Sequence, residues 1–326
     1  MSLRVLKPLI LGNGYLMPRL GIGTYQIRED LCKEIVHRAV TLGYRHIDTA
    51  QVYENEQDVG AGLHAVEKHK ICRRNDLFVT TKLSNISLHP RDVRPSLQES
   101  LEKLKLRHVD LFLIHSPWGL ANRGDGNLRP QLKNGTLEYA RYDIVQTWNA
   151  MENLVKEGLT KSIGISNFTQ NQMEKIFVTA KTKPHNVQFE CHAYYQQNVL
   201  RKFLGESGLN AITAYSPLGA PTRPERHVIP ENKFEILLGD RTVLEVAQKY
   251  NVSSALVLLR FLLEQNMAVL VKTSNFDRLE DNLKVVDFTL DHEDMSKLKN
   301  LDRNVKFFVF TTFQNHPDFP KPGEPY

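Results

Sequence analysis

The feature that most constrains the fold is a repeated alternation of short apolar or β-branched runs with longer amphipathic segments. One unit pairs "LFVTTKL" with "PRDVRPSLQESLEKLKL", and another pairs "KSIGISN" with "TQNQMEKIFVTA". Eight such strand–helix units can be counted between "LGIGT" and "DRLEDNLKVV", and the seventh carries a pair of helices. Alternation of this kind favours a parallel sheet covered by helices.

The number of units selects among parallel folds. A doubly wound sheet shares the alternation, but eight units in 326 residues are what a closed (β/α)8 barrel requires. No low-complexity linker divides the chain, so we predict one domain over residues 1–326. Helix signals agree with this interpretation: Asp143 is a candidate N-cap and Gly158 a candidate C-terminal stop for "DIVQTWNAMENLVKEG".

Composition excludes several classes of protein. The apolar content of 41% and charged content of 24% are ordinary for a soluble globular chain, and no apolar run approaches the roughly 20 residues that cross a bilayer. Lys7 and Pro8 interrupt the apolar start, which we interpret as the mature N-terminus of a cytosolic protein. Three cysteines without C-x-x-C spacing indicate a reducing compartment. The net charge of +5 is diffuse, so no nucleic-acid partner is predicted.

Polar side chains follow the apolar run in nearly every unit. They are Thr24, Asp48, Lys82, His115, Asn167, Gln188, Ser216 and Lys272. In a barrel these strand ends meet at one rim, where active sites lie. Strands that simply emerge into solvent would explain polarity at one or two ends. They explain poorly an Asp, a Lys and a His at three successive ends with Tyr53 nearby.

These groups suggest a proton-transfer site. Lys82 taken alone is more often solvated, but beside Asp48 it gains a counter-ion. Its charge is then expected to lower the pKa of Tyr53 from about 10 towards working pH, so that the phenol acts as an acid or a base. His115 alone is as often a core residue as a functional one. At the same rim it can orient a carbonyl oxygen near Tyr53.

Proton delivery to oxygen is useful if hydride reaches the adjacent carbon, and this implies a cofactor. The fingerprint G-x-G-x-x-G is missing, because "GIGTYQ" has Gln26 in place of the third glycine. Residues suited to a carboxamide and a flat ring are Ser166, Asn167, Gln188 and Tyr215. Lys272 and Arg278 supply two cations near a helix N-terminus for a phosphate. A 2′-phosphate there would select NADP over NAD.

Three separated motifs resemble one family. They are "GYRHIDTAQVYENEQDVG" at 43–60, "MENLVKEGLTKSIGISNF" at 151–168 and "LVKTSNFDR" at 270–278. With the shorter matches "LGIGTY", "TTKL", "LFLIH", "QFECH" and "AYSPLG", the similarity covers essentially the whole chain. The sequence resembles the aldo-keto reductases, close to the aldose reductase and hydroxysteroid dehydrogenase branch.

This resemblance implies a (β/α)8 barrel with an N-terminal hairpin and a long C-terminal loop that binds NADPH without a Rossmann domain. It implies a catalytic tetrad of Asp48, Tyr53, Lys82 and His115, with Tyr53 as general acid. The implied cofactor residues are Gly23, Thr24, Asp48, Ser166, Asn167, Gln188, Tyr215, Ser216, Leu218, Lys272, Thr273, Ser274, Arg278 and Asn282. The partner implied is a small-molecule carbonyl substrate, and relatives of this branch are commonly monomers.

The substrate pocket is expected to lie between the loop 118–142, the loop after Leu218 and the C-terminal tail. Its predicted residues are Tyr25, Tyr53, His115, Trp118, Phe307 and Phe308. Phe310 and a proline-rich stretch complete an apolar tail, although such phenylalanines can also simply pack the tail onto the barrel. Apolar aldehydes or ketones are therefore expected, with sugars, steroids and lipid aldehydes all admissible.

The chain departs from the family pattern at several positions. Ser116 follows the histidine where relatives often carry an aromatic residue. Ala220 and Thr222 replace a serine and an aspartate that clasp the cofactor in aldose reductase-like members, which predicts faster NADPH release. Glu225 replaces a pocket tryptophan, and Val271 replaces a proline, for which we have no functional account.

Two other readings compete with the reductase. A metal-dependent hydrolase on the same barrel would require a metal-binding histidine motif such as H-x-H or H-E-x-x-H. The sequence has neither, so no metal site is predicted. A non-catalytic NADPH-binding or structural protein on the same fold is the second alternative. Four tetrad groups together favour the enzyme.

Overall fold

Eight parallel strands close into a barrel in the computed structural model, which describes residues 6–221, 236–321 and 324. The barrel strands are β3 (Leu20–Gly23), β4 (His46–Asp48), β5 (Phe78–Leu83), β6 (Val109–Ile114), β7 (Thr160–Ser166), β8 (Asn186–Glu190), β9 (Ile212–Tyr215) and β10 (Ala268–Val271). Each strand pairs with the next along the chain, and β10 closes the ring on β3. The predicted (β/α)8 fold is therefore confirmed.

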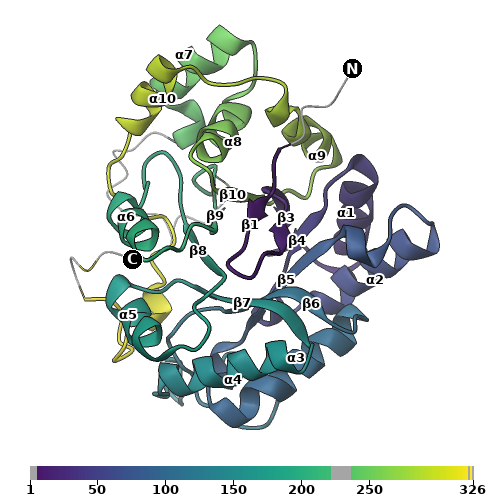
Figure 1. The fold of residues 1–326 in the computed structure, drawn as a ribbon, viewed down its shortest axis with the longest axis vertical. Helices are drawn as coiled ribbons and strands as arrows, with labels where there is room; N and C mark the ends of the chain where they lie inside the picture. Colours follow the sequence, from purple (N-terminus) through teal and green to yellow (C-terminus); the bar gives the residue numbers. More distant parts are fainter. Residues whose placement is uncertain (1–5, 222–235, 322–323, 325–326) are drawn as a thin grey trace.

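The helices form an outer ring around the strands (Figure 1). They are α1 (Glu29–Leu42), α2 (Glu56–Lys68), α3 (Pro90–Leu104), α4 (Ile144–Lys156), α5 (Gln170–Thr179), α6 (Asn198–Glu206), α7 (Arg241–Tyr250), α8 (Ser254–Glu264), α9 (Phe276–Leu283) and α10 (His292–Lys299). Both α7 and α8 lie between β9 and β10, which is the predicted helical pair. No helix in these described ranges is long and apolar enough to cross a membrane.

Local sequence signals explain where helices begin and end. The Asp143 carboxylate accepts a hydrogen bond from the Val145 N–H at 3.0 Å, so it caps α4 as predicted. Gly158 follows the same helix with a φ of 73°, the left-handed conformation that glycine adopts without strain. At α5, Thr169 and Gln172 form a reciprocal capping box.

The described part of the chain has three apolar clusters. Every residue of β5 and β6 is buried, because alternate side chains point into the barrel and towards the helices. The largest cluster fills the layer between strands and helices. Gly60 of α2 permits close packing between neighbouring helices, since a Cβ there would lie 2.4 Å from the Lys103 carbonyl oxygen of α3.

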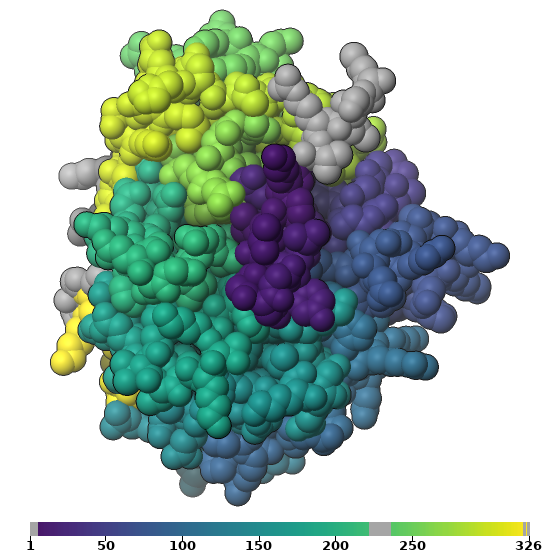
Figure 2. Space-filling model, viewed as in Figure 1, coloured from purple at the N-terminus to yellow at the C-terminus, as the bar shows by residue number. Residues whose placement is uncertain are grey.

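A hairpin formed by β1 (Leu9–Ile10) and β2 (Leu16–Met17) closes one end of the barrel. Leu9, Leu11 and Met17 pack with Phe78 and other barrel residues in the second apolar cluster. In Figure 2 the hairpin lies over the middle of this face. It covers the N-terminal ends of the strands, so the opposite end is left for the polar strand ends. The predicted hairpin and the long C-terminal segment after α10 are both present.

Candidate active site

The polar residues predicted at the strand ends lie at or next to the C-terminal ends of the barrel strands, except Gln188, which is the third of five residues in β8. Asp48 is the last residue of β4, and Lys82 is the fifth of six residues in β5. His115, Asn167, Ser216 and Lys272 each directly follow their strands. Because the barrel is closed, these positions converge on one rim. A short 3-10 helix, Gln51–Tyr53, carries Tyr53 to the same place.

Lys82 is the centre of this rim and is fully buried. Its ammonium group donates to the Asp48 Oδ1 at 2.5 Å, to the Thr49 carbonyl oxygen at 2.9 Å and to the Tyr53 hydroxyl oxygen at 3.3 Å. All three of its N–H groups are thus used. The second carboxylate oxygen of Asp48 accepts from the Gln188 amide at 2.9 Å. The predicted pairing of Asp48 with Lys82 is confirmed.

Tyr53 accepts its hydrogen bond from Lys82, which leaves the hydroxyl hydrogen free to point elsewhere. Its ring centroid lies 5.1 Å from that of Tyr25 and 5.6 Å from that of His115. Burial raises the pKa of Tyr53 well above its ordinary value, and the charge of Asp48 adds to this effect. The expectation that Lys82 lowers this pKa is therefore wrong for the protein alone. Tyr53 stays protonated at neutral pH, as a proton donor must.

His115 is shifted in the opposite direction. Burial, followed by the positive charges of Lys82 and Arg129, lowers the pKa of His115 well below its ordinary value. Its Nδ1 atom is buried and has no hydrogen-bond partner among the described residues. The imidazole is therefore neutral at neutral pH and can donate one hydrogen bond, which is the form suited to a carbonyl oxygen.

The predicted nicotinamide-binding residues form a connected network beside the tetrad. The Tyr215 hydroxyl donates to the Asn167 side-chain oxygen at 2.7 Å. The Asn167 amide nitrogen donates to the His115 carbonyl oxygen at 2.9 Å and to the Ser166 hydroxyl at 3.2 Å. On the other side, the Thr24 hydroxyl donates to the Asp48 carbonyl oxygen at 3.2 Å. Gly23, the last residue of β3, pairs with Asp48 in the sheet.

Two cations mark the predicted phosphate end. Lys272 follows β10, and Arg278 lies in the first turn of α9, where the Asn275 side chain caps the helix at 3.0 Å. Neither cation forms an ion pair within the described residues, so both are available to an anion. The other residues predicted for the pyrophosphate and adenosine end are Ser216, Leu218, Thr273, Ser274 and Asn282. This donor set, together with the amide and hydroxyl network, fits a nicotinamide dinucleotide with phosphate groups.

The predicted substrate residues divide into two groups. Tyr25 is 37% exposed and lies beside Tyr53, as a pocket wall would. Trp118 has no exposed surface, because the tail packs over it. Its ring lies 4.9–5.4 Å from those of Phe310, Phe313 and Phe319. Trp118 is therefore packed under the tail, and its predicted contact with the substrate stays a prediction.

The two tail phenylalanines also differ. The Phe307 ring lies 4.9 Å from that of His192 and joins the core, so packing, not substrate contact, explains its position. The Phe308 ring lies 5.4 Å from that of Tyr215, at right angles to it. Phe308 thus borders the predicted nicotinamide site.

Some of the positions that depart from the family pattern lie within the described residues, and Ser116 is one of them. The Ser116 hydroxyl accepts from the Asn85 amide at 2.7 Å, and the same nitrogen donates to the Trp118 carbonyl oxygen at 2.6 Å. Ser116 is buried, and this hydrogen bond helps to hold the loop that carries Trp118. Asn85 had no signal in the sequence beyond its position after a strand. Thr222 and Glu225 lie outside the described residues.

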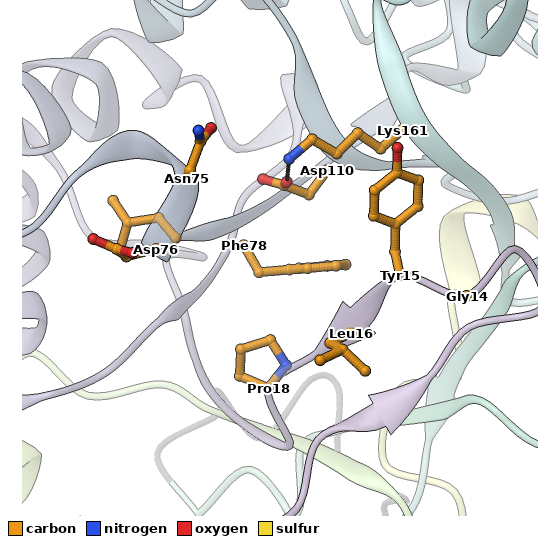
Figure 3. Close-up of a pocket in the computed structure, with 10 residues that line it drawn as sticks. Gly14, Tyr15, Leu16, Pro18, Asn75, Asp76, Phe78, Asp110 and Lys161 are labelled. Atoms are coloured by element: carbon orange, nitrogen blue, oxygen red, sulfur yellow. Dashed lines mark hydrogen bonds and ion pairs between the residues drawn. The ribbon is translucent and has the colours of Figure 1, made fainter.

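A cavity of about 320 Å³ opens at the opposite end of the barrel. Figure 3 shows Tyr15, Phe78, Asp110 and Lys161 around it. These residues come from the hairpin and the N-terminal ends of strands, and none belongs to the tetrad. In the ranges that the structure describes, no group of three or more His, Cys, Asp or Glu side chains is placed to hold a metal ion.

Comparison with known proteins gives one consistent family. A family profile described as "Aldo/keto reductase family" matches residues 16–303. The chain is 39% identical to aldo-keto reductase family 1 member A1 of Gallus gallus, over 96% of this chain and 97% of that protein. It is 37% identical to estradiol 17 beta-dehydrogenase 5 of Mus musculus, over 95% and 96%. The solved structure of the aldose reductase from Schistosoma japonicum matches with a TM-score of 0.89 at 36% identity, covering 98% of this chain and 99% of that one.

Proposed function

This chain belongs to the aldo/keto reductase family of oxidoreductases, which generally use NADP(H), and we propose that it reduces aldehydes or ketones to alcohols with NADPH and with Tyr53 as general acid. One observation carries the proposal. The buried Lys82 ammonium donates both to the Asp48 carboxylate and to the Tyr53 hydroxyl oxygen. This arrangement supports a phenol that can lose its proton to a substrate.

The proton transfer follows from that geometry. Because the Tyr53 oxygen accepts from Lys82, its own hydrogen can point towards a carbonyl oxygen. As the proton leaves, negative charge develops on the phenol oxygen, and the adjacent ammonium stabilises it. Asp48 keeps Lys82 in its charged form, because the charge of the carboxylate opposes the effect of burial on the pKa of that ammonium.

His115 is proposed to position the carbonyl group. Its neutral imidazole lies edge-to-face with the Tyr53 ring, so both can reach one oxygen atom. A neutral donor orients the oxygen without competing for the proton that Tyr53 delivers. The Asn167 side chain holds the backbone of His115 from the next strand.

The residues proposed to hold NADPH are the network and the two cations described above. Ser166, Asn167 and Gln188 would bind the carboxamide, and Tyr215 would stack on the ring. Lys272 and Arg278 would bind the 2′-phosphate and favour NADPH over NADH. When bound, the nicotinamide supplies the hydride that reaches the carbonyl carbon.

The proposed substrate is a small carbonyl compound with an apolar part, because Tyr25 lies beside Tyr53 and Phe308 lies beside Tyr215. Among the relatives, one is named for estradiol and a solved structure is named an aldose reductase. We therefore carry both steroid and sugar classes into the test. A cytosolic location and a monomeric state are further proposals, and gel filtration of the pure protein tests the second.

The test is NADPH consumption by the full-length protein with a panel of aldehydes and ketones. We expect loss of NADPH absorbance with at least one member of the panel and formation of the matching alcohol by mass spectrometry. NADPH binding without consumption of any carbonyl would support the non-catalytic alternative and overturn the enzyme. NADH in place of NADPH serves as the cofactor control and is expected to be used more slowly.

A further inference from the structure

Glu190 is a buried carboxylate that the proposed chemistry does not use. It is the last residue of β8, and its side chain has no exposed surface. Its Oε1 atom accepts from the Phe307 N–H at 2.7 Å and from His192 Nε2 at 3.2 Å, and its Oε2 atom accepts from the Phe308 N–H at 3.0 Å. Burying a carboxylate is costly unless such partners compensate it. Glu190 therefore has a structural task that involves the C-terminal tail.

Backbone N–H groups of the tail are held at two places at the end of β8 and just after it. The Tyr194 carbonyl oxygen accepts from the N–H groups of Arg303 and Val305, both at 3.1 Å. Glu190 accepts from two N–H groups further along the tail, those of Phe307 and Phe308. The first attachment involves only backbone atoms. The second depends on one side chain, so a substitution can remove it alone.

The second attachment lies next to the proposed active site. The Phe308 ring packs edge-to-face on Tyr215, which is hydrogen-bonded to Asn167. From Phe308 the contacts continue to Phe310 and from there to Trp118, with ring centroids 6.3 Å and 5.0 Å apart. The position of the Phe308 backbone therefore fixes an aromatic wall beside Tyr215 and the predicted nicotinamide site.

We propose that Glu190 is a positioning residue that holds the Phe308 wall in place and so controls the binding of bulky apolar carbonyl substrates. The inference rests on the proposed function of the same site. Hydrogen bonds to a charged acceptor are about twice as strong as neutral ones, and one carboxylate here receives two consecutive backbone N–H groups. An amide side chain would place an N–H donor against one of them.

The ionisation of Glu190 agrees with this role. Burial by itself would raise the pKa of Glu190, but the hydrogen bond and charge of His192, the charge of Lys306 and the Phe307 N–H outweigh it. The resulting pKa lies below its ordinary value, so the carboxylate is charged at neutral pH.

The first measurement does not depend on activity. Hydrogen–deuterium exchange of the wild-type protein should show protected amides at Phe307 and Phe308, and Glu190→Gln should expose both while the amides of Arg303 and Val305 remain protected. Exchange at Phe307 and Phe308 in the wild type as fast as in an unstructured peptide would overturn the proposal, whether or not the protein is an enzyme.

The second measurement uses two substrates from the active panel, a short aliphatic aldehyde and a bulky aromatic carbonyl compound. In Glu190→Gln, the KM of the bulky substrate should rise about tenfold, with kcat nearly unchanged, while the short aldehyde is unaffected. Equal changes for both substrates, or a change confined to kcat, would contradict a positioning role. Failure of the wild type to consume NADPH would instead refute the proposed function.

Two variants control for general destabilisation. Asp110→Asn also removes a buried carboxylate that accepts a backbone N–H, but at the other end of the barrel, so it should leave both KM values unchanged. Phe308→Ala should raise the KM of the bulky substrate as Glu190→Gln does. The double variant should be no worse than Phe308→Ala, because both changes remove one wall. Additive effects would contradict the proposal.

Discussion

The two ends of the barrel hold the same four residue types in different surroundings. At the C-terminal end are Asp48, Lys82, Tyr53 and His115. Around the hairpin end are Asp110, Lys161, Tyr15 and His108, three of which Figure 3 shows. Each end contains a lysine from one strand paired with an aspartate from a neighbouring strand. The difference between them must therefore lie in burial and in the hydrogen bonds, not in the residue types.

The lysines differ most. The Lys82 side chain has no exposed surface, whereas that of Lys161 is 28% exposed. Lys82 uses its three donors on Asp48, Thr49 and Tyr53, while the described contacts of Lys161 include only one hydrogen bond from its ammonium group, to Asp110. Asp110 also forms an ion pair with Arg74, at a distance of 2.7 Å. Water can therefore solvate the charged ammonium group of Lys161 but not that of Lys82.

The two tyrosines differ in burial and in hydrogen bonding, as the two lysines do. The Tyr53 oxygen is hydrogen-bonded to Lys82, and its pKa is raised by burial. Tyr15 is 48% exposed, and Lys161 lies 5.7 Å from the centre of its ring. Only the first phenol has a cation placed to stabilise its oxygen as the proton leaves. The two ends have the same residue types. Their capacity for proton transfer therefore depends on how far water is excluded and on the direction of each hydrogen bond.

A large effect is expected from exchanging the two lysines for methionine, one at a time. Lys82→Met should lower kcat/KM for carbonyl reduction by about 10³-fold, because Tyr53 loses its stabilising cation and Asp48 is left unpaired. Lys161→Met should stay within about twofold of the wild type. Steady-state kinetics below the unfolding temperature of both variants measure this. An equal loss in both would show that the two ends do not differ in the way described.

A smaller effect is expected in the pH profile. Reduction needs protonated Tyr53 and neutral His115, and their pKa values are raised and lowered, respectively. The rate should therefore be flat from about pH 7 to about pH 9, falling only at higher pH as Tyr53 loses its proton and at low pH as His115 gains one.

Substitution of the histidine at each end tests the low-pH side of that profile. His115→Asn should remove the low-pH decline, while His108→Asn at the hairpin end should leave it unchanged. Single-turnover rates across this range measure the chemical step. A midpoint near pH 7 in the wild type would contradict the direction of the Tyr53 pKa.

Much of this arrangement was predictable from the sequence, and the reasons are physical. Alternation of strands and helices fixes which residues occupy strand ends, so the convergence of Asp48, Lys82 and His115 could be predicted. Their contacts follow because β4 and β5 are neighbours in a parallel barrel. The N-cap Asp143 was predictable for the same local reason.

What the sequence could not provide depends on solvent access and on distant contacts. The direction of the Tyr53 pKa depends on how far water is excluded and on the proximity of Asp48, and neither can be read from spacing. The burial of Trp118 depends on a tail almost 200 residues later in the chain. The role of Glu190, within the motif "QFECH", likewise depends on N–H groups of this distant tail.

The central claim is that Tyr53, and not merely a tyrosine beside a lysine, delivers the proton. The most direct measurement is the single-turnover rate of carbonyl reduction in Tyr53→Phe compared with Tyr15→Phe. We predict a loss of about 10² to 10⁴-fold for Tyr53→Phe and no change for Tyr15→Phe. A Tyr53→Phe variant that reduces the carbonyl at the wild-type rate would contradict this account.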